Sequence, residues 1–131
     1  MSAKTTIVPW LSVRNGFDAV EFYKRAFRAV ELYRVENEKR EVVSQLAVDG
    51  APFWVSDESP PHLNFSPETL GGGTVKMILT VGDPDASFAR AVSAGAKEVS
   101  PVVNSHGWRV GRVADPYGHH WEIGKPLSSN P

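Results

Sequence analysis

The predicted elements of this chain occur twice in the same order, and this repeat limits the possible fold more than any other feature. Residues 5–58 are predicted as a strand, a helix and three strands, and residues 74–125 repeat that order. Identities spaced 67 residues apart (85 − 18, for example) support the repeat: Asp18 and Asp85, Ala29 and Ala96, Glu31 and Glu98. The sequence therefore predicts an α+β fold built from two βαβββ modules.

The first module combines an alternating strand with an amphipathic helix. In residues 5–13 the alternation puts Leu11 and Val13 on one face, and the opposite face carries Val8, Trp10 and Ser12. The helix begins near Asp18, where a carboxylate suits the helix dipole. Its apolar positions recur at helical spacing and predict core packing: Ala19, Phe22, Tyr23, Ala26, Phe27 and Val30. The three strands that follow are predicted at residues 29–36, 41–48 and 52–57.

A connector rich in proline and glycine, residues 59–73, separates the modules. The triplet Gly71-Gly72-Gly73 lacks the Lys and Ser/Thr of a phosphate-binding loop, so it is interpreted as flexible linker. The second module is predicted as a strand, a helix and three strands at residues 75–81, 84–94, 97–103, 108–114 and 119–124.

The last two predicted strands form a hairpin around a turn motif. Asp115, Pro116 and Gly118 are typical of a type I turn, which predicts a four-residue loop. With such a loop, Val113 faces His120, Gly111 faces Glu122 and Arg109 faces Gly124. Because side chains alternate along a strand, this register places Arg109, His120 and Glu122 on one face. The other face is then predicted to carry Arg112, Trp121 and Ile123.

Composition excludes several classes of function. The 131 residues carry a net charge of −1, which gives no electrostatic reason to expect nucleic acid or a membrane surface as partner. The chain has no cysteine, which excludes disulfides and thiolate chemistry. No apolar run approaches the ~20 residues of a membrane span, and residues 1–6 lack a signal-peptide pattern. We therefore expect a cytoplasmic protein with a single domain, residues 1–131.

Several motifs in order resemble one protein superfamily. They are Phe22-Tyr23-Lys24-Arg25-Ala26-Phe27, Ala94-Gly95-Ala96, Arg109-x-Gly111-x-Val113-x-Asp115-Pro116, and Gly118-His119-x-Trp121-Glu122. This set is similar to the vicinal oxygen chelate superfamily, which includes glyoxalase I, extradiol dioxygenases and bleomycin-resistance proteins, and to its PhnB-like, glyoxalase-like subgroup. The resemblance spans roughly residues 7–124. It implies two paired modules whose mixed sheets form a cup, and often a homodimer.

The family usually has glycine after the first helix. Arg28 stands there in this chain, so that cap is built differently or is strained.

The resemblance also implies where a divalent metal would be held, at four positions on the first and last strands of the modules. Glu122 matches the last-strand glutamate, whereas the other positions fall on Val8, on Lys76, and on Trp54 or Val55, with the register of that strand open. Three missing ligands favour the absence of a metal; if one is present, its ligands are Glu122 and His120. No other cofactor is expected.

The same residues suggest two roles for the side chains that would line the cup. Lys76 could pair with Glu122 while Arg109 adds positive charge, either as a self-satisfied ion network or as a site for an anionic or polar molecule. Trp10, Trp54 and Ser12 would line the same cup. One function predicted from these features is binding of a small organic molecule without a metal in the usual site. The alternative is a metal-dependent lyase, isomerase or dioxygenase.

Overall fold

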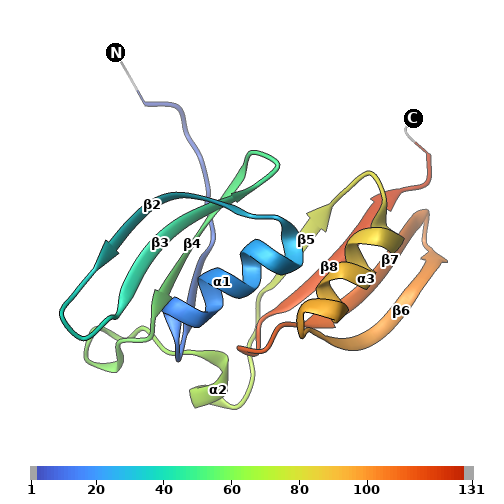
Figure 1. The fold of residues 1–131 in the computed structure, drawn as a ribbon. Coiled ribbons are helices and arrows are strands. Elements are labelled where there is room, and N and C mark those ends of the chain that lie inside the picture. Colours follow the sequence, from blue (N-terminus) through green and yellow to red (C-terminus); the bar gives the residue numbers. More distant parts are fainter. Residues whose placement is uncertain (1–2, 129–131) are drawn as a thin grey trace.

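The computed structural model describes residues 3–128 and contains the two predicted modules in sequence order (Figure 1). The first module consists of β1 (Trp10–Val13), α1 (Gly16–Phe27), β2 (Val30–Glu36), β3 (Val42–Val48) and β4 (Ala51–Asp57). The second consists of β5 (Lys76–Thr80), α3 (Pro84–Ala94), β6 (Lys97–Ser105), β7 (Trp108–Ala114) and β8 (His120–Pro126). The predicted βαβββ repeat is therefore confirmed.

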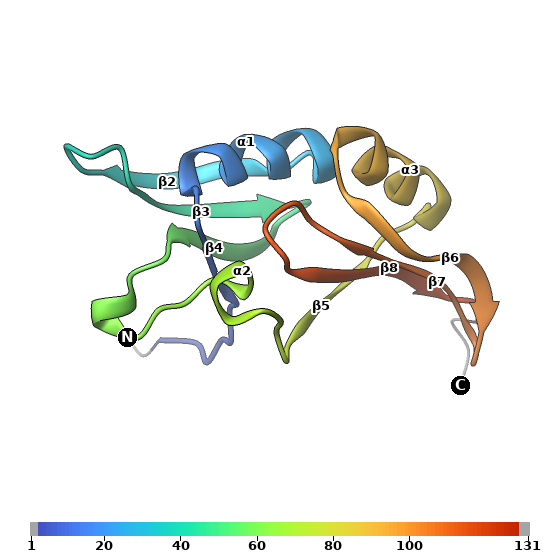
Figure 2. The same ribbon diagram turned by 90° about the horizontal axis from the view of Figure 1, so that it is seen from below.

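Each module has one mixed four-stranded sheet. The strand orders are β1-β4-β3-β2 and β5-β8-β7-β6; β1 pairs with β4 and β5 with β8 in parallel, and the remaining pairs are antiparallel. The two main helices, α1 and α3, contact each other and lie on the same side of the sheets (Figure 2). We call the opposite side of each sheet, which points away from these helices, the open face.

One hydrophobic core joins the modules. The apolar stripe of α1 is buried as predicted, except that Val30 lies in β2 and is exposed. The Phe27 ring lies 4.6 Å from the Trp121 ring of the second module, and Phe53 of β4 lies 5.6 Å from the same indole. Because these contacts cross between the modules, the two sheets share one packed interior.

The ends of α1 follow the sequence signals. The Asn15 side chain accepts a hydrogen bond from the Asp18 amide at 3.0 Å, which caps the first turn. Arg28 ends the helix with φ 58° and ψ 36°, the left-handed conformation that a side chain disfavours. The equivalent place after α3 is Gly95. The cap of α1 thus has the left-handed backbone that glycine usually adopts, but with an arginine in its place. The cap is therefore strained, which is one of the two predicted possibilities.

The connector between the modules is folded. It contains a 3₁₀ turn, Pro60–His62, and the short helix α2, Pro67–Leu70, on the side of the sheets opposite α1 and α3 (Figure 2). Glu58 ties it to β4 by accepting hydrogen bonds from the Ser66 amide and the Thr69 hydroxyl, both at 2.8 Å. Gly71 caps α2 with φ 81°. The interpretation of the glycine triplet as flexible linker is therefore wrong for Gly71, because its left-handed conformation ends a helix.

Among residues 3–128, no helix combines the length and the apolar character that crossing a membrane requires.

Candidate functional site

The turn between β7 and β8 is one residue shorter than predicted. The Asp115 amide donates to the His119 carbonyl at 2.8 Å, so only three residues lie between this pair. Gly118 has φ 93°, which is typical of the three-residue loop built from a type I turn and a left-handed residue. The register therefore shifts by one: Ala114 pairs with His120, and Arg112 pairs with Glu122.

Because of this shift, Arg109 and Arg112 of β7 each lie on the face of the sheet that was predicted for the other. The prediction that Arg109 shares a face with His120 and Glu122 is wrong, because its side chain lies on the helix-facing side. There its Nε and Nη2 donate to the two carboxylate oxygens of Asp85, both at 2.7 Å. The bond from Arg109 holds the pKa of Asp85 below its ordinary value. Arg109 therefore ties β7 to α3.

The other arginine, Arg112, was predicted to lie on the face of Trp121 and Ile123, and this is also wrong. Its backbone pairs with Glu122, which places it on the open face. Its Nε donates to His120 Nδ1 at 3.1 Å. Sequence reasoning missed Arg112 as a site residue, and the signal that could have found it is Gly118, whose left-handed preference is compatible with the shorter loop.

Lys76 and Glu122 form the pair that the residue pattern predicted. Lys76 Nζ lies 2.7 Å from Glu122 Oε2 on the open face of the second sheet. A divalent ion at Glu122 would have to displace this ammonium group. In the described part of the chain, no three His, Asp or Glu side chains are grouped as a metal site requires. These donors do not fit the divalent ion that the resemblance implies at this position.

The first module contains the structural counterpart of this pair. Trp10 Nε1 donates to Ser56 Oγ at 2.9 Å, and both pairs span 46 residues. The pairing of the parallel strands is also the same in the two modules. Trp10 of β1 pairs with Trp54 of β4, and Lys76 of β5 pairs with His120 of β8. The positions equivalent to Lys76 and Glu122 are thus Trp10 and Ser56.

The resemblance placed the first-strand position on Val8, whereas the strand pairing places it on Trp10. Val8 precedes β1 and lines a cavity between the modules, and Trp54 is the counterpart of His120. Val55 points into the core and is fully buried. Neither an indole nor a serine hydroxyl supplies the carboxylate or imidazole that zinc prefers, so the correction adds no strong ligand.

Aromatic side chains cover part of the open face of the first sheet. The Trp10 and Trp54 rings stack at 5.7 Å with an interplanar angle of 21°, and Tyr33 meets Trp54 edge-on at 6.0 Å. Trp10 remains 49% exposed. Ser12 lies on the same face and is half-buried. The predicted orientation of β1, with Leu11 and Val13 in the core, is confirmed.

His119 lies between the modules and has a structural role. Its Nε2 is 2.9 Å from the carbonyl oxygen of Ser12 in β1. His62 and His106 are exposed in turns, each hydrogen-bonded to a neighbouring serine. His119 therefore ties the β7–β8 turn to β1, whereas His62 and His106 face solvent.

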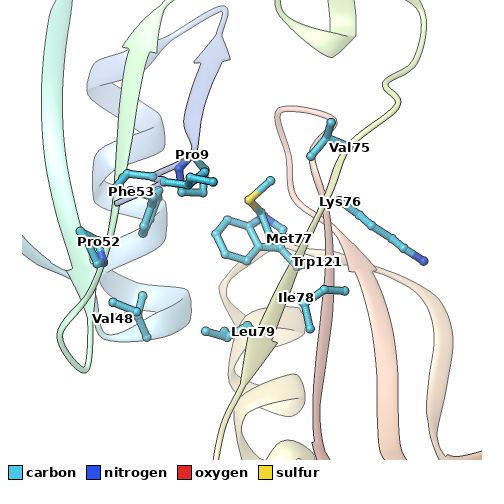
Figure 3. A pocket seen from close by; sticks show the side chains of 13 residues that line it. Pro9, Val48, Pro52, Phe53, Val75, Lys76, Met77, Ile78, Leu79 and Trp121 are labelled. Carbon is cyan, nitrogen blue, oxygen red and sulfur yellow. The ribbon is translucent and has the colours of Figure 1, made fainter. Parts of the chain in front are cut away.

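A cavity of about 550 Å³ lies at the seam between the two sheets. Figure 3 shows Phe53 and Val48 of the first module opposite Met77 and Leu79 of β5, while the Lys76 side chain points away from this group. The lining is almost wholly apolar. The ammonium group of Lys76 therefore lies on the open face and not in the seam cavity.

A smaller pocket of about 260 Å³ lies beside Trp10. Its other walls include Phe65 and Leu70 of the connector and Met77 of β5. Sequence reasoning missed the two connector residues, because nothing in their spacing indicates that α2 packs against β1. The pocket has the apolar walls and exposed aromatic ring that a small organic molecule can contact.

Comparisons with known proteins agree with this architecture. The glyoxalase-like domain family matches residues 11–124. The uncharacterized protein Rv0887c of Mycobacterium tuberculosis (strain H37Rv) is 37% identical over 97% of this chain and 78% of its own length. The solved structure of the Arabidopsis thaliana At5g48480 product is 33% identical, with a TM-score of 0.71 over 92% of this chain and 98% of that one. TioX from Micromonospora sp. ML1 is 28% identical, with a TM-score of 0.75 over 95% and 100%. The chain therefore belongs to the glyoxalase-like domain family of the vicinal oxygen chelate superfamily.

Proposed function

We propose that this protein binds a small organic molecule and does so without a divalent metal in the position that metal-dependent relatives use. The observation that carries the proposal is the stacked pair Trp10–Trp54 on the open face, with Trp10 half-exposed beside an apolar pocket. A large exposed ring next to a pocket offers contact area at little cost in side-chain entropy. We also propose membership of the PhnB-like subgroup and a cytoplasmic location.

The alternative is a metal-dependent lyase, isomerase or dioxygenase. Such chemistry needs a divalent ion that binds two neighbouring oxygens of the substrate. In the second module the carboxylate of Glu122 is already held by Lys76 at 2.7 Å, and the equivalent pair in the first module is Trp10 with Ser56. This donor set supports ligand binding rather than metal catalysis.

The proposal includes a homodimer. Both open faces present apolar side chains to solvent, including Tyr33 and Val35 of β2 and Ile78 of β5. Exposed apolar surface of this kind is typical of interaction sites. Pairing of two copies through the open faces would cover these residues and enclose the Trp10 pocket more fully.

The binding proposal can be tested by calorimetric titration with 2-naphthamide, a neutral aromatic probe. We expect saturable binding to the wild-type protein and binding at least about tenfold weaker to Trp10→Ala, because the ring contact is lost. Trp108→Phe is the matched control, since Trp108 starts β7 and lines a different cavity. Equal binding by the wild type and Trp10→Ala, or no binding by either, would reject the proposed site.

A further inference from the structure

A second pocket, lined in part by two basic side chains, adjoins the Trp10 pocket. It encloses about 370 Å³ between the end of the connector, the start of β5 and the β7–β8 turn. Lys76, Arg112 and His120 line it, together with Gly73 and Thr74. The residues come from three separate segments of the chain, so the pocket depends on the complete fold.

The Arg112 guanidinium lacks a carboxylate partner in this pocket. It is half-buried, and none of the salt bridges among the described residues involves it. Glu122 is its cross-strand neighbour, but that carboxylate is held by Lys76 and lines a different cavity. Arg112 uses its Nε on His120, which leaves the four N–H groups of its two terminal nitrogens free to bind a ligand.

The connector adds neutral donors at the same place. Within residues 3–128, the amides of Gly73 and Thr74 donate to no protein acceptor. A side chain built at Gly73 would meet no atom within 4 Å, so the backbone there is open to approach. The pocket is thus lined by two residues whose amides have no protein acceptor among the described residues and by a planar guanidinium, and such groups can hold carboxylate oxygens.

The formal charges favour a monoanion. Lys76 and Arg112 carry two positive charges and Glu122 carries one negative charge, so the three together have a net charge of +1. A single carboxylate neutralises this charge, whereas a doubly charged phosphate exceeds it. The guanidinium fork also matches the two oxygens of a carboxylate.

The basic pocket and the Trp10 pocket share a wall. Gly72, Gly73, Thr74 and His119 line both, so the apolar side near Phe65 and the basic side near Arg112 are contiguous. A molecule that spans this shared wall would place its ring against Trp10 and its acidic group against Arg112.

We propose that the ligand of this site is a flat aromatic carboxylic acid, whose carboxylate is recognised by Arg112 and by the Gly73 and Thr74 amides. This inference rests on the proposed function, because it names the class of molecule that the Trp10 pocket binds. Lys76 serves mainly to hold Glu122 and adds long-range attraction. Arg112 is the residue that distinguishes an acid from its neutral analogue.

The test compares 2-naphthoate with 2-naphthamide, two probes of nearly the same shape that differ in charge. We expect calorimetry to show binding of the acid about ten- to hundredfold tighter than binding of the amide. Arg112→Gln should remove this preference, because it weakens binding of the acid much more than binding of the amide. Arg109→Gln is the matched control: it removes an arginine from the same strand on the opposite face, so the preference should persist.

The outcomes separate this inference from the proposed function. Equal affinity for acid and amide, or an undiminished preference in Arg112→Gln, overturns the acid site while Trp10-dependent binding of the amide still supports the proposed function. If neither probe binds, both proposals fail. Tighter binding of 2-naphthyl phosphate than of 2-naphthoate overturns the assignment to a monoanion. Arg112→Lys keeps the charge without the fork and should retain only part of the preference.

Discussion

The Tyr23 hydroxyl of α1 donates a hydrogen bond of 2.5 Å to the carboxylate of Asp115, 92 residues later in the turn between β7 and β8. Asp115 is buried and also accepts from the Trp121 indole at 2.9 Å and from two turn amides at 3.0 Å. Burial, together with the charge and hydrogen bond of Asp115, raises the pKa of Tyr23 well above its ordinary value. This buried group connects the first helix to the turn that sets the register of the open face.

Replacing Tyr23 with phenylalanine should lower the free energy of unfolding by about 1.5–3 kcal/mol, because a buried hydrogen bond to a charged group is lost. Urea denaturation followed by circular dichroism measures this difference. Tyr33→Phe is the control, since Tyr33 is exposed on β2, and its effect should stay within about 0.5 kcal/mol. Equal effects for the two variants would mean that the Asp115 bond contributes little.

Arg28→Gly should stabilise the protein. Arg28 has φ 58°, a conformation that costs a side-chain-bearing residue roughly 1–2 kcal/mol and costs glycine little. Part of this gain is offset by the greater freedom of glycine in the unfolded chain, so we expect a net increase of about 0.5–1 kcal/mol. Thermal unfolding measures it. Arg25→Gly, inside α1, should instead destabilise by about 1 kcal/mol. A lower melting temperature for Arg28→Gly would show that the cap is not strained.

Glu31 should make stability depend on pH under acidic conditions. Burial alone would raise its pKa, but hydrogen bonds from Arg34 and Ser44, both at 2.7 Å, and from Lys24 leave it below its ordinary value of 4.5. A lowered pKa in the folded state stabilises the protein above about pH 4.5. This contribution is lost as the pH falls through the folded pKa.

The matching experiment follows unfolding by urea from pH 7 down to pH 3. Glu31→Gln should be about 1–2 kcal/mol less stable than the wild type at pH 7, with the gap closing at the acidic end. Glu98→Gln is the control, because Glu98 is the exposed repeat of Glu31 in β6. A gap for Glu31→Gln that stays constant with pH would refute the assigned role.

The proposed homodimer predicts twice the mass of the single chain in sedimentation velocity at micromolar concentration. Ile78→Lys should shift the population toward monomer, because Ile78 is 59% exposed on the open face of the second sheet. Val92→Lys is the control, since Val92 lies on α3, on the opposite side. A monomer throughout the concentration range, or dissociation caused equally by both variants, would contradict an interface on the open faces.

The fold could be predicted because its signals are local and repeated. The alternation of Leu11 with Trp10 and the helical stripe of Phe22 and Tyr23 follow from burial alone, and the repeat sets their order. The absence of glycine after the first helix also predicted an unusual cap at Arg28, either built differently or strained, and the structure has the second. Such features depend on near neighbours in the chain, which the sequence displays directly.

The site was harder to predict because it depends on register and on long-range packing. One residue in the loop at Gly118 exchanges Arg109 and Arg112 between faces, and a turn pattern alone does not determine that length. Likewise, the connector packs next to β1 through α2, which brings Phe65 near Trp10 although no periodicity connects them. Lys76 with Glu122 was predictable, since both positions came from the family motif.

The central claim is that the protein binds an organic molecule without a divalent metal, and one titration tests it most directly. Calorimetry with 2-naphthamide is run on the wild-type protein in excess EDTA and again with added Mn²⁺ or Zn²⁺. Because Lys76 already holds Glu122 at 2.7 Å, we predict the same affinity under all conditions. Binding that disappears in EDTA, returns with metal and is lost in Glu122→Gln would contradict the account and restore a metal-dependent site.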